Sequence, residues 1–262
     1  MAAWDAEMGY GSVWSQSLGL DRASIRRGFV RKVYGTVAVQ LAATAVIAAP
    51  IATASDRWLQ AYGPTLLTAS LLLPLVMLVA ACMSRGMQNL MRHYPTNMGM
   101  LLLFTLSESC MVGLICSSYE LQSILLCLGV TAGAVTTLTL WAMQTELDTT
   151  EFGPQLAAAS WGLFAVGLLA LLLGSPMLET LYACGAGLLF AAYLVYDTQL
   201  IVGNKHESRR EFSIDDYAFA SLLIYLDIVR MFIYLLQLLG KDNGHHGKGN
   251  AVAVGRQQRR RR

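Results

Sequence analysis

The hydropathy of the chain alternates between seven long apolar runs and short polar connections. A helix needs about 20 consecutive apolar residues to cross the hydrocarbon core of a bilayer, and each run comes close to that length. The pattern therefore predicts an all-α membrane protein, a bundle of seven helices. The predicted spans are 33–53, 64–82, 97–117, 121–143, 155–174, 177–202 and 217–239.

Polar sequence at both ends divides the chain into three parts. Residues 1–24 are small and polar and are predicted to form a disordered cytosolic tail, and residues 25–239 form the seven-span transmembrane domain. Residues 240–262 are Gly-rich and basic and are predicted to be a second disordered tail. Apolar positions at helical spacing within residues 24–32 predict an interfacial helix that continues into the first span.

Lysine and arginine residues in the connections predict the orientation of the bundle, because short cytosolic loops of membrane proteins carry an excess of them. Ten lie on the side of the N-terminus, and only Arg57 lies on the other. The N-terminus is therefore predicted to be cytosolic. The ten residues are Arg22, Arg26, Arg27, Arg31, Lys32, Arg85, Arg92, Lys205, Arg209 and Arg210.

The basic C-terminal tail conflicts with seven complete crossings, which would place it on the non-cytosolic side. In one interpretation the seventh run crosses fully, since late charges do not always decide topology. In the other it is re-entrant and returns to the cytosol. Asp227 near the middle of the run, with Arg230 one turn later, suits a broken or shallow helix lined by protein.

Composition supports the membrane class and argues against several enzymes. The chain is 55% hydrophobic and 14% charged, whereas soluble domains carry about 25% charged residues. It has no H-E-x-x-H, G-x-S-x-G or P-loop motif. An intramembrane aspartyl protease has a G-x-G-D environment at its second aspartate, and LIYLDIV has no glycine there. We therefore expect no enzymatic activity, no cofactor and no nucleic-acid partner.

Two carboxylates interrupt the last two apolar runs: Asp197 in AAYLVYDTQL and Asp227 in LLIYLDIVRMF. An aspartate at mid-membrane costs about 3 kcal/mol on insertion scales, so two of them in neighbouring spans indicate a function. If they meet, both cannot stay ionised in a low dielectric, and the pair shares a proton. Such a pair is a pH-sensitive latch, and once deprotonated it attracts a divalent cation.

An alternative interpretation of these acids stays open. Counting helical rise from the predicted ends of the two spans places Asp227 roughly 9 Å deeper than Asp197. This difference closes if the sixth span ends later than predicted, or if residues 214–220 lie in the interface. In the alternative, Asp227 pairs with Arg230 at i, i+3, and Asp197 caps or bonds a neighbouring helix.

Glu108 is a third acid within an apolar run, in FTLSESCMVG. It is either a ligand in a cation pathway or a protonated glutamate that is hydrogen-bonded across helices. The connection at 144–154, QTELDTTEFGP, carries three further acids and no base. Such a loop is either a vestibule that gathers cations or an ordinary solvated loop. Thr149 or Thr150 is expected to cap the helix that follows.

Five stretches of the chain resemble the transmembrane Bax-inhibitor-motif family, specifically its lifeguard branch. The YDTQ and YLDI pieces are specific, and the stretches follow the order of the family. They are RRGFVRKVYGTVAVQL at 26–41, HYPTNMGMLLLFTLSESCMVG at 93–113, QTELDTTEFG at 144–153, GAGLLFAAYLVYDTQLIVG at 185–203 and DDYAFASLLIYLDIVRMFIYLL at 215–236.

The resemblance implies a central last helix and a calcium leak gated by Asp197 and Asp227, where calcium binds only transiently as the permeant ion. It also implies a membrane of the endoplasmic reticulum or Golgi, with vacuolar and plasma membranes left open. Some members latch the pair with an arginine in the second span. That span has no base here, so the latch is absent or Arg230 substitutes for it.

The predicted function is therefore a pH-sensitive calcium leak channel of an internal membrane, which contributes to calcium homeostasis and suppresses programmed cell death. Its expected partners are the lipid bilayer, calcium and protons. The alternative is a non-conducting membrane scaffold that inhibits cell death by binding cell-death regulators or other membrane proteins. The basic tail and the small-residue faces of several helices favour that alternative.

Overall fold

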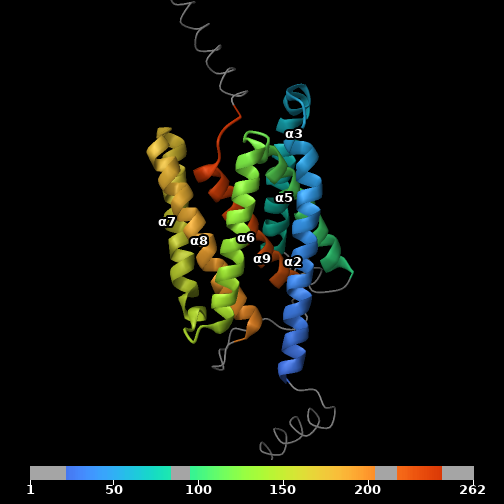
Figure 1. Ribbon diagram of the computed structural model, residues 1–262, viewed down its shortest axis with the longest axis vertical. Helices are drawn as coiled ribbons and strands as arrows, with labels where there is room; N and C mark the ends of the chain where they lie inside the picture. The colour runs from blue at the N-terminus through green and yellow to red at the C-terminus, as the bar shows by residue number, and fades with distance from the viewer. Residues whose placement is uncertain (1–21, 84–94, 204–216, 244–262) are drawn as a thin grey trace, which may run out of the picture.

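The computed structural model describes residues 22–83, 95–203 and 217–243. Within these ranges seven helices are long and apolar enough to cross a membrane, and they form one elongated bundle (Figure 1). The predicted all-α membrane fold is confirmed. Most of the two predicted tails lies outside the described residues, as do Arg85, Arg92, Lys205, Arg209 and Arg210.

Most helices keep their predicted bounds to within a few residues, but the first two begin earlier. The basic segment before the first span is helical and continuous with that span. The second helix begins at Asp56, where an acid in the first turn suits the positive end of the helix dipole. Pro64, the predicted start of this span, consequently lies inside the helix. The elements are α2 (Arg22–Ala52), α3 (Asp56–Met83), α5 (Thr96–Cys116), α6 (Leu121–Gln144), η1 (Thr149–Phe152), α7 (Gly153–Leu173), α8 (Pro176–Val202) and α9 (Tyr217–Leu239).

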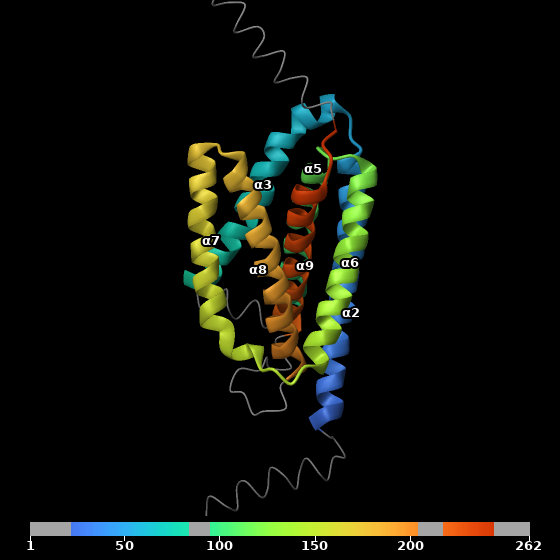
Figure 2. The same ribbon diagram turned by 60° about the vertical axis from the view of Figure 1, so that its left-hand side comes forward.

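A Gly-Ser-Pro turn joins α7 to α8. Gly174 has a φ of 58°, in the left-handed region that favours glycine, and its N–H donates to the carbonyl of Ala170 at 2.9 Å. Pro176 then begins α8, in the first turn of the helix, where a backbone N–H would have no partner within the helix. The two helices consequently run antiparallel at one edge of the bundle (Figures 1 and 2).

Helix α9 is the centre of the bundle, since α2, α5, α6 and α8 all pack against it (Figure 2). Ile224, Tyr225 and Leu236 on α9 are fully buried. By contrast, α3 and α7 lie on the outside and expose large apolar side chains such as Leu72 and Leu171. The central last helix that the resemblance implies is confirmed, and the apolar outer surface is the kind that faces lipid.

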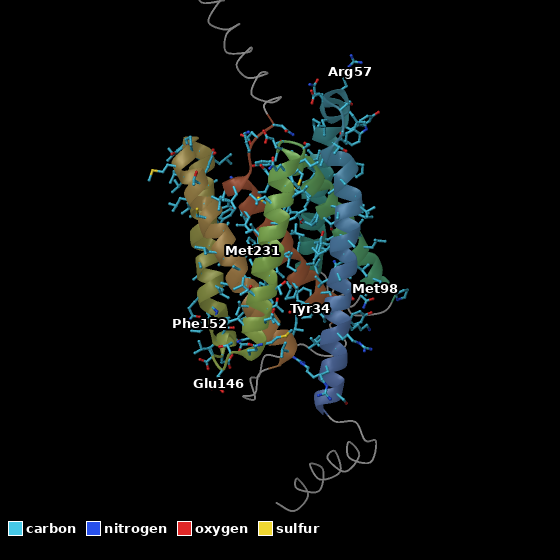
Figure 3. The ribbon with its side chains drawn as sticks, in the orientation of Figure 1. Tyr34, Arg57, Met98, Glu146, Phe152 and Met231 are labelled. Carbon is cyan, nitrogen blue, oxygen red and sulfur yellow. The ribbon has the colours of Figure 1, made fainter. Side chains whose placement is uncertain are left out.

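Helix α9 is also unbroken over 23 residues and runs through the whole bundle. Just beyond its end, the carbonyl of Lys241 accepts the N–H of Glu120 at 2.9 Å, in the connection between α5 and α6. This connection and Arg57 lie at one end of the bundle, and Glu146 lies at the other (Figure 3). The seventh run therefore crosses fully, and the re-entrant alternative is wrong.

Candidate functional site

The structure brings Asp197 of α8 and Asp227 of α9 into direct contact. The two carboxyl groups lie close enough to share a hydrogen bond, and the two residues are 5% and 6% exposed. Ionised carboxylates only accept hydrogen bonds, so a bond between them requires a proton on one of the two groups. The arrangement is thus a buried acid pair that is able to share a proton.

The predicted depth difference of roughly 9 Å between the two aspartates is wrong. That count assumed that the end of α8 and the start of α9 lie at the same level, and the contact between the carboxyl groups shows that the assumption fails. The axial offset between packed helices depends on how their side chains fit together. Counting residues from the helix ends does not capture it.

The residues around Asp197 in the YDTQ piece each hold a different part of the bundle. The hydroxyl of Tyr34 on α2 and that of Thr198 share a hydrogen bond of 3.0 Å. Gln199 accepts from the N–H of Thr149 at 2.7 Å and donates to the carbonyl of Leu147 at 2.9 Å. Asp197 therefore sits beside residues that tie α8 to α2 and to the acidic loop.

The acidic loop is fixed to the bundle and not simply solvated. Asp148 caps η1 by accepting from the N–H of Thr150 at 2.9 Å and from its hydroxyl at 2.5 Å. Asp148 therefore caps η1, whereas the N-cap of α7 is Phe152, which makes no side-chain cap hydrogen bond. Neither threonine caps the following helix, which corrects the predicted capping role. The short Asp side chain precedes the helix, where it reaches the first free N–H groups. A cation vestibule at this loop stays a prediction.

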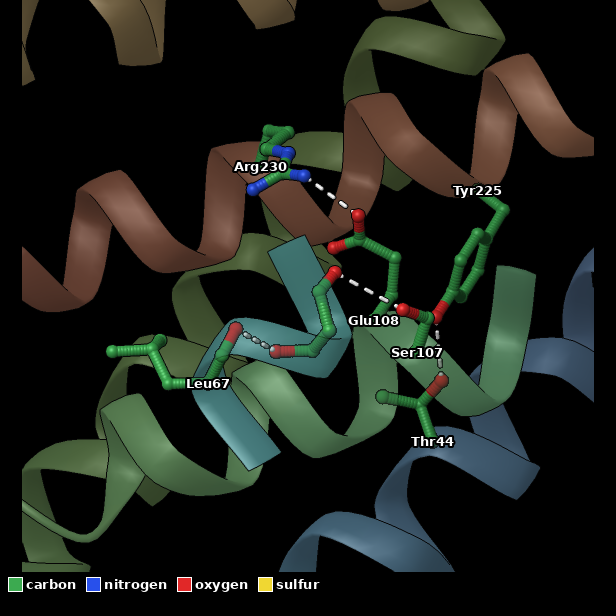
Figure 4. A network of polar contacts seen from close by, with 7 residues as sticks. Thr44, Leu67, Ser107, Glu108, Tyr225 and Arg230 are labelled. Carbon is green, nitrogen blue, oxygen red and sulfur yellow. Dashed lines mark hydrogen bonds and ion pairs between the residues drawn. The ribbon is translucent and has the colours of Figure 1, made fainter. Parts of the chain in front are cut away.

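Glu108 of α5 forms an ion pair with Arg230 of α9. The Nη2 atom of Arg230 donates to Oε1 of Glu108 at 2.7 Å, and the carboxylate side chain is only 3% exposed (Figure 4). Glu108 is therefore bonded across helices, as one alternative predicted, but its partner is a cation and it need not be protonated.

This ion pair corrects the two roles expected for Arg230, as partner of Asp227 and as latch of the aspartate pair. The two aspartates lie next to each other, whereas the ion-pair partner of Glu108 is Arg230. A guanidinium is attracted most strongly to the buried carboxylate that lacks other compensation.

A chain of hydroxyl groups surrounds Glu108, and the sequence interpretation missed it. Ser109 donates to Thr44 at 3.2 Å. Thr44 in turn shares a hydrogen bond of 2.9 Å with Tyr225 (Figure 4). Ser107 donates to the carbonyl of Ser70 on α3 at 3.0 Å (Figure 4). The sequence shows these groups only as isolated polar residues within apolar runs. Their hydrogen-bond partners lie on other helices, so the sequence does not reveal the pairs.

These features define a polytopic α-helical membrane protein with a buried aspartate pair and a separate ion pair inside the bundle. The family described as "Inhibitor of apoptosis-promoting Bax1" matches residues 26–244, so the chain belongs to this family. It is also similar to the "Golgi anti-apoptotic protein" of the Lister and LC16m0 strains of vaccinia virus. Each is 29% identical over 238 residues, which is 90% of this chain and 93% of the viral protein.

Proposed function

We propose that this protein is a calcium leak pathway of an internal membrane, gated by the protonation of Asp197 and Asp227. The observation that carries the proposal is the close contact between these two buried carboxyl groups on adjacent helices. A group of this kind is expensive inside a membrane unless it serves an ion or a proton.

The shared proton holds the path closed. With one proton, the pair has a single negative charge and a hydrogen bond that joins α8 to α9. Loss of the proton leaves two carboxylates, and charges about 4 Å apart repel by about 4 kcal/mol at an effective dielectric of about 20. The helices then separate at this point, and the carboxylate oxygens become ligands of the type that calcium prefers. Acidification therefore closes the path and alkaline pH opens it.

Contacts next to the pair link its opening to the rest of the molecule. Thr198 and Gln199 follow Asp197 directly and bind Tyr34 on α2 and Thr149 in the acidic loop. A rotation of α8 at Asp197 therefore strains or breaks these bonds. The pathway opens at the end of the bundle where the acidic loop lies, and the lysine and arginine distribution predicts that this end is cytosolic.

The relatives support the cellular role. The viral proteins are called Golgi anti-apoptotic proteins, and the family is described as an inhibitor of apoptosis-promoting Bax1. Suppression of programmed cell death through the calcium content of an internal store, such as the Golgi or the endoplasmic reticulum, is the role that we infer for this chain.

Calcium flux into vesicles with the reconstituted protein tests the proposal, with Asp197→Asn and Asp227→Asn compared with wild type across pH. Asp56→Asn, at the exposed start of α3, is the matched control. We expect wild-type calcium flux to rise with pH. Asp197→Asn and Asp227→Asn should lose this pH dependence, and the control should keep it. Equal flux and an equal pH midpoint in all four proteins would contradict the gate. Absence of flux at every pH would leave the non-conducting scaffold as the better account.

A further inference from the structure

One face of α9 carries a polar residue at each turn from its middle to its end. Asp227, Arg230, Tyr234 and Gln237 follow a spacing of three, four and three, which places them on one side of a helix. At about 1.5 Å per residue the series extends about 15 Å. This is about half of a hydrocarbon core of about 30 Å. In a helix that is otherwise apolar, such a face suits the passage of a polar species.

The far part of this series leads to a cavity. The hydroxyl of Tyr234 and that of Tyr182 on α8 share a hydrogen bond of 3.1 Å, and the rings meet edge to face. Beyond them, Tyr182, Gln237 and Glu179 line a cavity of about 410 Å³ between α7, α8 and the end of α9. The polar face of α9 thus runs from the aspartate pair to a cavity that contains a carboxylate.

The ion pair of Glu108 and Arg230 interrupts the series between the aspartate pair and the cavity. Oε1 of Glu108 accepts from Arg230 at 2.7 Å, while Oε2 is buried and has no hydrogen-bond partner among the described residues. Glu108 as a whole is 2% exposed, whereas the side chain of Arg230 is 29% exposed. One oxygen of the buried carboxylate is therefore bonded and the other is not, and the guanidinium is the more exposed partner of the pair.

We propose that Glu108 is a second calcium site of the pathway and that Arg230 is a tethered cation that occupies it. This rests on the proposed calcium leak. While the guanidinium lies on Glu108, it neutralises the carboxylate and repels an approaching cation. When the pair separates, the two carboxylate oxygens can bind calcium. A single carboxylate holds the ion weakly enough for the ion to leave again, as conduction requires.

A purely structural role explains these observations less well. Apolar side chains of similar volume hold two helices together as firmly as a buried ion pair or more so. Packing also gives no reason for the position of the pair on the polar face of α9.

The two halves of the ion pair make opposite predictions for calcium flux, which tests the proposal. Arg230→Gln removes the tethered cation and leaves the carboxylate, so calcium flux at a fixed pH rises about five-fold or more, the lower end of typical coupling effects. Glu108→Gln leaves an uncompensated guanidinium in the path, so flux falls below that of wild type. The double variant Glu108→Gln/Arg230→Gln does not show the increase in calcium flux that Arg230→Gln shows by itself. Arg57→Gln, at the end of the bundle, is the control and leaves flux unchanged.

A merely structural pair gives a different result, because loss of either partner loosens the bundle and changes the flux in the same direction. Changes of the same sign in both single variants, or no change in either, would overturn the proposal. Release of an entrapped carboxyfluorescein dye measures general leakiness and stays at the wild-type level. If Arg230→Gln does not fold, the calcium flux of Glu108→Gln decides: a flux below that of wild type supports the proposal, and a flux equal to or above it contradicts the proposal. If calcium flux depends on Asp197 and Asp227 but not on Arg230, the role of the ion pair is refuted and the proposed calcium leak stands. If the wild-type protein conducts no calcium, the proposed function itself is refuted.

Discussion

Gln199 and Thr149 are 50 positions apart in the chain, and the side-chain oxygen of Gln199 accepts both the N–H and the hydroxyl of Thr149, at 2.7 Å and 2.5 Å. Gln199 lies two residues after Asp197, so the acidic loop is attached to α8 directly beside the aspartate pair. The loop is therefore anchored to α8 two residues from the proposed gate.

We expect Gln199→Leu to release this loop. The side chain accepts two hydrogen bonds and donates two, to the carbonyls of Leu147 and Ala142. At about 1 kcal/mol net for each bond, the loss in unfolding free energy is about 2–4 kcal/mol. Thermal unfolding in detergent measures it. Gln155→Leu, at an exposed position at the start of α7, is the control and stays within about 0.5 kcal/mol. Equal effects in both variants would show that the loop is not held by Gln199.

At Gly113, helix α5 packs closely against α2. A Cβ atom at Gly113 would lie 2.7 Å from Cβ of Ile51 and 3.0 Å from the carbonyl oxygen of Ala48. Gly113→Ala therefore pushes the two helices apart and costs about 1–3 kcal/mol. Gly129→Ala on α6 meets nothing within 4 Å and gains about 1 kcal/mol from helix propensity. The two melting temperatures should move in opposite directions, and a loss of stability in both would refute the distinction.

The shared proton of Asp197 and Asp227 makes the stability of the bundle depend on pH. The hydrogen bond between the carboxyl groups exists only while the folded protein holds this proton, so it contributes to stability at low pH and is lost as the pH rises. Wild-type melting temperature should therefore fall with rising pH more steeply than that of Asp227→Asn, whose amide bonds Asp197 without a proton. Parallel curves for the two proteins would contradict the shared proton.

Tyr119, in the connection between α5 and α6, lies outside the spans and packs next to the end of α9. Burial raises the pKa of its phenol above the usual value, and the nearby Asp242, Cys116 and Cys127 add to the rise. The folded state therefore holds the phenolic proton more tightly than the unfolded chain. This stabilisation is complete below the usual tyrosine pKa of about 10 and is lost as the pH rises through the higher value in the folded state.

The expected consequence is a fall in melting temperature between about pH 9 and about pH 11 that is steeper for wild type than for Tyr119→Phe. Tyr62→Phe serves as the control, because Tyr62 is 56% exposed on the outer helix α3. It should follow the wild-type curve. A Tyr119→Phe curve that also coincides with wild type would exclude a contribution from this phenol.

Some contacts could not be read from the sequence. Asp197, Asp227 and Glu108 were visible as candidates because a carboxylate in an apolar run is rare whatever surrounds it. The partner of Arg230 was not visible. At i, i+3 on the same helix Asp227 was the nearest acid in sequence, but the guanidinium reaches Glu108, 122 positions away. Thr44, Gln40 and Tyr225 were overlooked for the same reason, since each is bonded to a residue on another helix or packs between helices.

By itself, the sequence determined the class of the protein, the number and approximate ends of its spanning helices and the identity of its buried acids. These depend on how each segment by itself interacts with water or hydrocarbon. Only the tertiary structure decided that α9 crosses the bundle completely, that Asp197 touches Asp227 and that Arg230 belongs to Glu108. Such pairings depend on the axial offset and rotation of packed helices, which many weak contacts set together and no single segment encodes.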